Sequence, residues 1–281
     1  MKRFAVLAIL VAALAGCGQS AERKPPEIKL YAMECGRIHV TDADAFADDG
    51  SFAEQARDMV DPCYLIRHPD GDLLWDSGLP DLLNEQADGV TQGPFQLSMP
   101  TKLVTQLAQL DLAPGDIDFI SLSHSHFDHL GNAALFASAT WLVDPDERAH
   151  MFRPEARADA QFASYSALEN FRQRAIEGDG DFDVFGDGSV IIVQAPGHTP
   201  GHTILRVNLL HAGPVLLTGD LWHMAESRAR RTVPRFNTSR EQTLASMDKA
   251  EALARATGAL VVRQHVPQDF AGLPKFPEAL N

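Results

Sequence analysis

The run His124-Ser125-His126-Phe127-Asp128-His129 places four metal-binding side chains within six consecutive residues. Imidazole and carboxylate groups together suit zinc and related divalent ions. Four donors this close in sequence cannot all reach one ion without severe distortion, so we expect them to be divided between two neighbouring ions. In an extended segment alternate side chains project to one side, and His124, His126 and Asp128 would then face the same way. Two ions need further donors, which the fold has to bring to this run.

Three further donors stand at the ends of hydrophobic, β-like runs later in the chain. They are His198, Asp220 and His265, and each lies at or shortly after the end of such a run. Loops at strand ends commonly carry binding and catalytic groups. Each residue alone is weak evidence, because polar residues often end strands by chance. Together with the first run, they predict one site built from the ends of several strands.

Hydrophobic β-like runs alternate with helical patterns along most of the chain. Strands are predicted at 28–33, 62–68, 72–76, 117–121, 140–144, 189–194, 203–210, 214–220 and 259–265. Helical patterns cover 102–110 and 151–176. A further helix should begin after Ser239, which opens a capping box, and stop at Gly258. Strands and helices interleaved in both halves indicate a layered α/β fold in one domain, residues 28–281.

Composition narrows the class of protein and of partner. The chain has 281 residues, of which 45% are hydrophobic, so it can bury a substantial core without relying on disulfides. The formal net charge of −14 would repel a phosphate backbone, and we expect no nucleic-acid partner. No window after the N-terminus is long and apolar enough to span a bilayer.

The N-terminal residues have the pattern of a targeting segment. Lys2-Arg3 gives a positive start, residues 4–15 are apolar, and Leu14-Ala15-Gly16-Cys17 follows. This pattern resembles a bacterial lipoprotein signal, in which residues 1–16 are removed and Cys17 becomes the lipidated first residue. The alternative is an ordinary signal peptide with a chance cysteine.

A lipidated Cys17 would hold the protein on a membrane surface without spanning it. Residues 17–27, which are polar and contain Pro25-Pro26, would then form a short tether. Gly18 stands where an aspartate is associated with retention in the inner membrane. We therefore expect an exported lipoprotein on the periplasmic face of the outer membrane.

Cys35 and Cys63 remain after removal of the signal. In an exported protein they can form one disulfide. Cys63 also lies in the apolar run 62–66, where a buried thiol is equally ordinary. The sequence leaves both possibilities open.

These motifs together resemble the metallo-β-lactamase superfamily. The resemblance rests on the run 124–129, on the segment 196–202 (Pro-Gly-His-Thr-Pro-Gly-His), on Gly219-Asp220, on the late His265 and on Asp76-Ser77-Gly78 after a strand. It spans roughly residue 28 to the C-terminus and implies an αββα sandwich of two mixed β-sheets flanked by helices. It also implies two groups of metal ligands and one bridging residue: His124, His126 and His198 for the first ion, Asp128, His129 and His265 for the second, and Asp220 between them.

A site of this kind would hydrolyse its substrate with a metal-activated water. Two adjacent divalent ions lower the pKa of a shared water to about 7 and polarise a carbonyl or phosphoryl oxygen. We expect Zn²⁺, with Mn²⁺, Fe²⁺ or Co²⁺ as alternatives. Asp128 or Asp220 would pass a proton to the leaving group. Asp76 would orient a ligand histidine, although a carboxylate that merely ends a strand is an equal alternative.

Within the superfamily, the chain most resembles the N-acyl homoserine lactone lactonases. The stretches 60–66, 74–80, 123–129 and 213–220 carry that resemblance. Penicillin-hydrolysing members typically lack a bridging carboxylate, so Asp220 argues against them. The lactonases have a tyrosine three residues after the bridging aspartate that contacts the lactone carbonyl, whereas this chain has His223. A histidine there can donate a hydrogen bond or act as a general acid, or it can be a loop residue without substrate contact.

Several alternatives remain open. Hydrolysis of a thioester, an organophosphate triester or a β-lactam is the rival within the fold, and a zinc-stabilised surface lipoprotein is the non-enzymatic rival. His202 is expected to support the site without binding metal. Phe95, Phe127 and Trp222 are candidates for an apolar acyl pocket. The arginines at positions 228, 230, 231 and 235 form a solvated basic loop or, alternatively, a lid over the substrate. The partner is a small ester or lactone, and the sequence does not indicate an oligomeric state.

Overall fold

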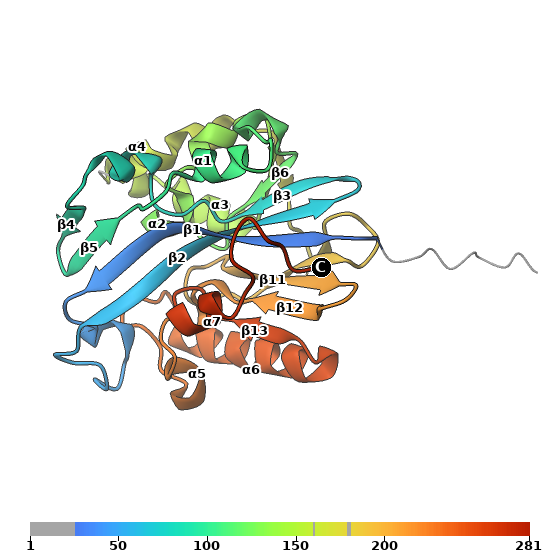
Figure 1. Ribbon diagram of the computed structural model, residues 1–281. Coiled ribbons are helices and arrows are strands. Elements are labelled where there is room, and N and C mark those ends of the chain that lie inside the picture. The colour runs from blue at the N-terminus through green and yellow to red at the C-terminus, as the bar shows by residue number, and fades with distance from the viewer. Residues whose placement is uncertain (1–25, 160, 179–180) are drawn as a thin grey trace, which may run out of the picture.

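The computed structural model describes residues 26–159, 161–178 and 181–281. Two β-sheets pack face to face and helices cover their outer faces, so the predicted αββα sandwich is confirmed (Figure 1). The first sheet has the strand order β4-β5-β1-β2-β3-β6-β7-β8 and the second has the order β13-β12-β11-β10-β9. Both sheets are mixed: β3, β6, β7 and β8 run parallel in the first, and β12 and β13 run parallel in the second.

The first sheet consists of β1 (Lys29–Val40), β2 (Arg57–His68), β3 (Gly71–Trp75), β4 (Val90–Gln92), β5 (Phe95–Ser98), β6 (Phe119–Ser121), β7 (Thr140–Val143) and β8 (Gln173–Ala175). The second consists of β9 (Phe182–Asp183), β10 (Val190–Gln194), β11 (Thr203–Leu209), β12 (Gly213–Leu217) and β13 (Leu260–Val262). The α-helices are α1 (Leu103–Ala108), α2 (Phe127–Leu130), α3 (Pro145–Met151), α4 (Phe162–Tyr165), α5 (Ser227–Arg230), α6 (Arg240–Thr257) and α7 (Pro267–Ala271). Short 3-10 helices are η1 (Asp44–Phe46), η2 (Asp81–Glu85), η3 (Pro114–Asp116), η4 (Ala133–Phe136), η5 (Ala156–Ala158), η6 (Ser166–Asn170) and η7 (Gly219–Leu221).

Three layers of apolar side chains hold the sandwich together. The central layer lies between the two sheets and includes Tyr64 and Trp75 from the first and Leu205 and Leu217 from the second. A second layer packs helix α1 against the outer face of the first sheet, and a third packs α6 against the second sheet (Figure 1). Strands buried on both faces read as continuous apolar runs, which is why β2 and β10 are recognisable in the sequence.

Helix α6 follows its sequence signals closely. The Ser239 hydroxyl accepts a hydrogen bond from the Gln242 backbone N–H, and Gly258 ends the helix with a φ of 69°. The prediction of a helix over 151–176 is wrong. That stretch is divided into the end of α3, the short helices η5, α4 and η6, and strand β8. Pro154 is one physical reason, because proline disfavours helical geometry at the preceding residue and removes a backbone donor.

Cys35 and Cys63 form a disulfide between β1 and β2, with their Cα atoms 5.7 Å apart. The question left open by the sequence is thus answered in favour of the bond. Both residues are fully buried against the core beside β3. Gly78 approaches them so closely that a Cβ atom there would lie 2.3 Å from the Cys35 Cβ. The disulfide therefore supports the segment that follows β3.

The disulfide is expected to stabilise the fold substantially. The two cysteines are 28 residues apart, and closing a loop of that length removes enough unfolded-state entropy to contribute about 3.5 kcal/mol. Cys35→Ser with Cys63→Ser should therefore lower the free energy of unfolding by roughly that amount in urea denaturation. Equal stability of the double variant and the oxidised parent would contradict this.

Among the described residues, no helix is long and apolar enough to cross a membrane. The predicted signal peptide, residues 1–16, lies outside the described residues, as does most of the predicted tether, 17–27.

Candidate active site

The seven predicted donors lie together at one edge of the sandwich. His124 and His126 follow strand β6, while Asp128 and His129 belong to the short helix α2. Their partners come from the second sheet: His198 lies between β10 and β11, Asp220 lies in η7 after β12, and His265 follows β13. Because β12 and β13 are parallel, their carboxyl ends meet at the same edge. The structure therefore brings the seven residues together at this edge.

The donor atoms form two groups. His124, His126, His198 and Asp220 make the first, and Asp128, His129 and His265 make the second. Within each group, the donor atoms lie within 4.8 Å of one another. The expectation that alternation would turn Asp128 to the same side as His124 and His126 is wrong, because α2 begins at Phe127 and redirects Asp128 to the second group.

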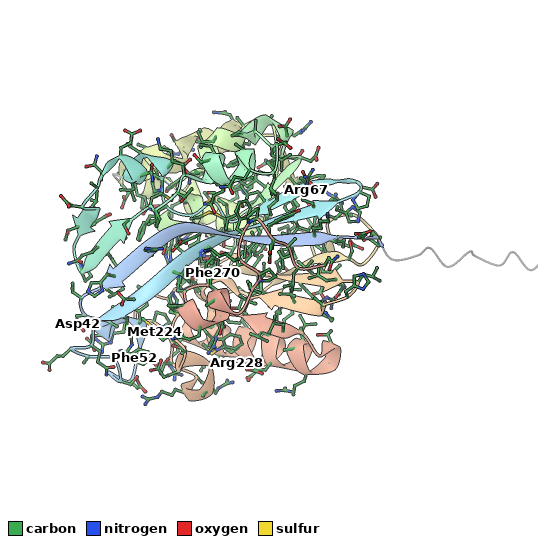
Figure 2. The ribbon with its side chains drawn as sticks, in the orientation of Figure 1. Asp42, Phe52, Arg67, Met224, Arg228 and Phe270 are labelled. Atoms are coloured by element: carbon green, nitrogen blue, oxygen red, sulfur yellow. A yellow bond between two sulfur atoms is a disulfide. The ribbon has the colours of Figure 1, made fainter. Side chains whose placement is uncertain are left out.

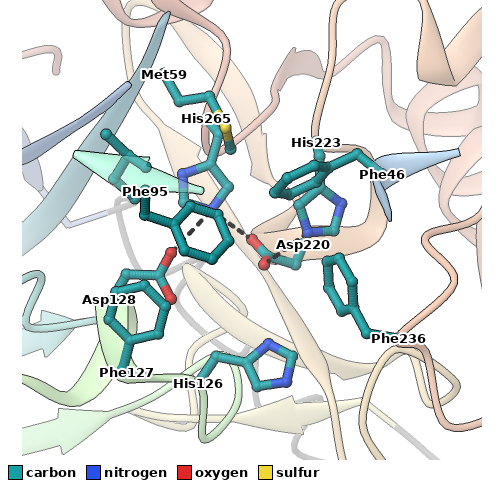
Figure 3. A pocket seen from close by; sticks show the side chains of 11 residues that line it. Phe46, Met59, Phe95, His126, Phe127, Asp128, Asp220, His223, Phe236 and His265 are labelled. Carbon is teal, nitrogen blue, oxygen red and sulfur yellow. Dashed lines mark ion pairs between the residues drawn. The ribbon is translucent and has the colours of Figure 1, made fainter. Parts of the chain in front are cut away.

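Asp220 lies between the two groups. Its Oδ2 is 3.3 Å from His198 Nε2 and its Oδ1 is 2.9 Å from His265 Nε2. One carboxylate oxygen thus faces each group, as a bridging ligand requires. Figure 3 shows Asp220 opposite Asp128 on the floor of a pocket, with His265 beside it.

The chemistry of these atoms fits divalent metal ions. His198 Nε2 lies 3.1 Å from His124 Nε2 and 3.0 Å from His126 Nδ1, so three imidazole nitrogens converge on one point. In the second group, His129 Nε2 and His265 Nε2 are buried and both face Asp220 Oδ1, at 3.3 and 2.9 Å. Burying this many imidazole and carboxylate groups at one point is costly unless an ion binds them. The His and Asp groups therefore imply divalent metals.

Carboxylates and carbonyls behind the ligands fix the orientation of the imidazole rings. His129 Nδ1 is 2.9 Å from Asp76 Oδ2, and Asp76 also accepts hydrogen bonds from the backbone N–H and the hydroxyl of Ser123. His265 Nδ1 is 3.0 Å from the carbonyl of Val60. A ring that donates through Nδ1 presents the lone pair of Nε2 to a metal. Asp76 therefore lies where the resemblance implied.

His202 lies beneath Asp220 and supports it. Its Nδ1 donates to the Ala195 carbonyl, and its Nε2 accepts a hydrogen bond of 3.1 Å from the Asp220 backbone N–H. Burial, followed by the nearby His198, lowers the pKa of His202 to about 3, which keeps the ring neutral. Both nitrogens of His202 are thus engaged, and the geometry agrees with a supporting role.

The electrostatics favour the metal-binding protonation state of Asp220, His124 and His126, but a protonated ring at His265. Burial raises the pKa of Asp220, but the surrounding histidines outweigh burial and hold it well below its usual value. Burial is the largest cause that lowers the pKa of His124 and His126, and neighbouring imidazoles add to it. Burial also lowers the pKa of His265, but Asp220 outweighs it and raises that pKa to about 9. Metal binding at His265 would therefore release a proton.

Above the donors lies an apolar pocket of about 270 Å³ (Figure 3). Its wall is made of six hydrophobic side chains: Ile38, Phe46, Met59, Phe95, Phe127 and Phe236. Phe95 and Phe127 were expected here. Trp222 was also expected, but it is buried in the core between η7 and α6. Sequence reasoning missed Phe46, the last residue of the three-residue helix η1, and Phe236, which lies outside the helices and strands, because no periodic pattern indicates their direction.

His223 forms part of the same pocket. Its Nε2 is 2.9 Å from Asp220 Oδ2, and its ring stacks on His265 at a centroid distance of 5.8 Å. Burial lowers its pKa to about 4 in spite of the opposing effect of Asp220. At neutral pH His223 is therefore an uncharged ring beside the bridging carboxylate.

Three of the arginines after Asp220, at positions 228, 231 and 235, are paired with carboxylates. Arg228, which is labelled in Figure 2, binds Glu251 of α6 and lies over the Trp222 ring. Arg231 binds Asp248, also on α6. None of the arginines at 228, 230, 231 and 235 lines the pocket. The arrangement favours the solvated basic segment over a substrate lid.

Comparison with known proteins agrees with this geometry. Residues 58–265 match the Metallo-beta-lactamase superfamily. The chain belongs to that superfamily. An N-acyl homoserine lactonase, AttM of Azorhizobium caulinodans, is 29% identical over 259 residues, which cover 89% of this chain and 98% of that protein. An N-acyl homoserine lactonase of Bacillus cereus is 27% identical over 224 residues, covering 77% of this chain and 85% of that one.

Solved structures of other proteins are also similar to this chain. One is an N-acyl homoserine lactone hydrolase with the product N-hexanoyl-L-homoserine bound at its catalytic metal centre. It superposes with a TM-score of 0.74 at 25% identity and covers 90% of this chain and 98% of that chain. A mutant of AiiA from Bacillus thuringiensis, with N-decanoyl-L-homoserine bound at its active site, has the same fold, with a TM-score of 0.74 at 24% identity, and likewise covers 90% and 98% of the two chains.

Proposed function

We propose that this metallo-β-lactamase superfamily member is a dinuclear metal-dependent lactonase that opens N-acyl homoserine lactones, a quorum-quenching activity. The observation that carries the proposal is the pair of donor groups joined by Asp220 on the floor of an apolar pocket. The relatives named N-acyl homoserine lactonase cover most of this chain, which supports the choice of lactones over other esters.

The donor set favours Zn²⁺ at both positions, because imidazole and carboxylate ligands suit zinc and buried His-rich sites are typical of it. When bound, the two ions supply a hydroxide at neutral pH and polarise the lactone carbonyl. Mn²⁺, Fe²⁺ and Co²⁺ accept the same ligands.

The side chains of this protein bind the substrate and move the proton. The hydrophobic wall takes up the acyl chain, and its aromatic side chains keep bulk water from the reacting ester. A water oxygen adds to the lactone carbonyl, and collapse of the resulting tetrahedral adduct restores the C=O bond, breaks the ring ester C–O bond and leaves an alkoxide. Asp128 lines the pocket and is one of two carboxylates placed to carry the proton from that water to the alkoxide. Asp220 is the other, and its two oxygens are directed to the two donor groups.

A substrate comparison tests the proposal. Purified protein loaded with zinc is offered N-acyl homoserine lactones, a thioester, an organophosphate triester and a β-lactam, and kcat/KM is measured for each. Ring opening of the lactone should have the highest value. A higher kcat/KM for any of the other three compounds would contradict the proposal and would indicate that class of compound as the substrate.

His223 is the residue in which this chain departs from the lactonase pattern, and its replacement is informative. His223→Phe fills similar space but removes the ring nitrogen that faces Asp220 Oδ2 at 2.9 Å. We expect lactone turnover to fall roughly 10- to 100-fold, as is usual when a group supporting a metal ligand is lost. The exposed His211→Phe is the matched control and should be unaffected. An unchanged rate for His223→Phe would show that the side chain contributes nothing.

We also propose that the protein is an exported lipoprotein at the periplasmic face of the outer membrane, with residues 1–16 as signal, 17–27 as tether and 28–281 as catalytic domain. The lipoprotein-like sequence ending in Cys17 supports this, and a disulfide suits an oxidising compartment. Cys17→Ala should move the protein from the membrane fraction to the soluble fraction. Continued sedimentation of the variant with membranes would contradict the anchor.

A further inference from the structure

The carboxylate of Glu147 joins the two loops that carry the histidines of the first donor group. It lies in α3, is only 3% exposed, and sits outside the donor groups themselves. Its Oε1 accepts a hydrogen bond of 2.8 Å from the backbone N–H of Ser125, the residue between His124 and His126. Its Oε2 accepts one of 3.0 Å from the backbone N–H of Gly201, in the loop of His198. The Glu147 side chain thus links a loop of the first sheet to a loop of the second sheet, behind the first donor group.

The surroundings of Glu147 fix the position of its carboxylate. Asp144 caps α3 by accepting hydrogen bonds from the backbone N–H groups of Asp146 and Glu147. Asp144 also accepts a hydrogen bond from the side chain of Gln194, the last residue of β10. Gly201 packs so tightly on this corner that a Cβ atom would lie 2.4 Å from the Glu147 nitrogen. The start of α3 is therefore tied to the strand that leads to His198.

We propose that Glu147 is a positioning residue for the first metal ion and sets the distance between His198 and the pair His124 and His126. His198 Nε2 lies 3.1 Å from His124 Nε2 and 3.0 Å from His126 Nδ1, so a small displacement of either loop would separate the nitrogens that have to bind one ion. The second group has independent supports. His129 is held by Asp76 and by the Ser77 backbone and hydroxyl, and His265 is held by the Val60 carbonyl.

Glu147→Gln tests this with almost no change of shape. Glutamine has one acceptor oxygen, and its NH₂ group can only donate, so it can satisfy one loop amide while opposing the other. The affinity for zinc is measured by competition with a chelator in two backgrounds. His265→Ala leaves the first group intact, and His198→Ala leaves the second intact. Glu147→Gln should weaken zinc binding 10- to 100-fold in the first background and leave it unchanged in the second.

Glu155→Gln, an exposed change that likewise removes one negative charge close to α3, is the matched control and should change neither affinity. Equal weakening in both backgrounds, accompanied by a lower melting temperature, would show a merely structural role and overturn the proposal. No weakening in the His265→Ala background would also overturn it. If Glu147→Gln does not fold, Glu147→Asp replaces it. Aspartate keeps the charge but is too short to reach both loops, and the same selective loss is expected.

The inference rests on the proposed two-ion site but not on the substrate. A protein that binds two ions and opens no lactone would therefore overturn the proposed function and leave the role of Glu147 standing.

Discussion

Replacing Asp220 with alanine should reduce lactone turnover by roughly 10³-fold or more, because charge stabilisation by the metal centre is the largest contribution to catalysis in such a site. The side chain is 2% exposed, and its two oxygens face different donor groups. Its loss removes the one carboxylate that bridges them. It also leaves the converging imidazoles without the negative charge that balances bound ions.

The expected measurements are kcat/KM for an N-acyl homoserine lactone and the number of zinc ions per chain. Asp220→Ala should lower both while the circular dichroism spectrum stays close to that of the parent. Asp88→Ala, an exposed aspartate of the β4 region, is the control and should lower neither. Turnover that survives in Asp220→Ala would remove this residue from the mechanism.

Removal of the metal ions should abolish activity and destabilise the fold. A ligand that binds only the folded state at a free concentration 1,000 times its Kd contributes about 4 kcal/mol. For a chain of this size that corresponds to roughly 10 °C in melting temperature for one tightly held ion. The effect should be large here because the chelated protein keeps seven buried or half-buried imidazoles and carboxylates crowded together without the ions that would bind them.

Differential scanning calorimetry of the zinc-loaded and chelated protein measures this shift. Calcium in place of zinc is the control, since calcium prefers six to eight oxygen ligands and should not restore the melting temperature. Equal melting temperatures with and without zinc would mean that the two donor groups do not hold ions in the folded protein.

The strands and the metal donors are predictable from the sequence because both depend on local patterns. The 62–66 part of β2 and most of β10 are continuous apolar runs, and α6 has a cap at each end. His198, Asp220 and His265 stand where such strands end, so the parallel edge of the second sheet brings them together. The metallo-β-lactamase fold then brings these three residues to the run 124–129.

The features of the site that the sequence does not indicate depend on contacts between segments that are distant in the chain. Glu147 has an ordinary helix-start sequence, and nothing in it shows that two backbone amides from other loops will meet its carboxylate. Trp222 and Phe236 both come after Asp220 in the chain and both lie outside the helices and strands. Trp222 is nevertheless buried in the core, whereas Phe236 is 43% exposed and lines the pocket. The residues 151–176 have helical periodicity, but Pro154 interrupts it, and the resulting short segments pack against the core of the first sheet.

The most direct test of a two-ion lactonase is a titration of zinc into chelated protein while ring opening of an N-acyl homoserine lactone is followed with a pH indicator. Ring opening releases one proton per lactone and should rise from zero to a plateau at about two zinc ions per chain, matching the two donor groups. Ring opening by the chelated protein, or its absence at every ratio of zinc to protein, would contradict the proposed function.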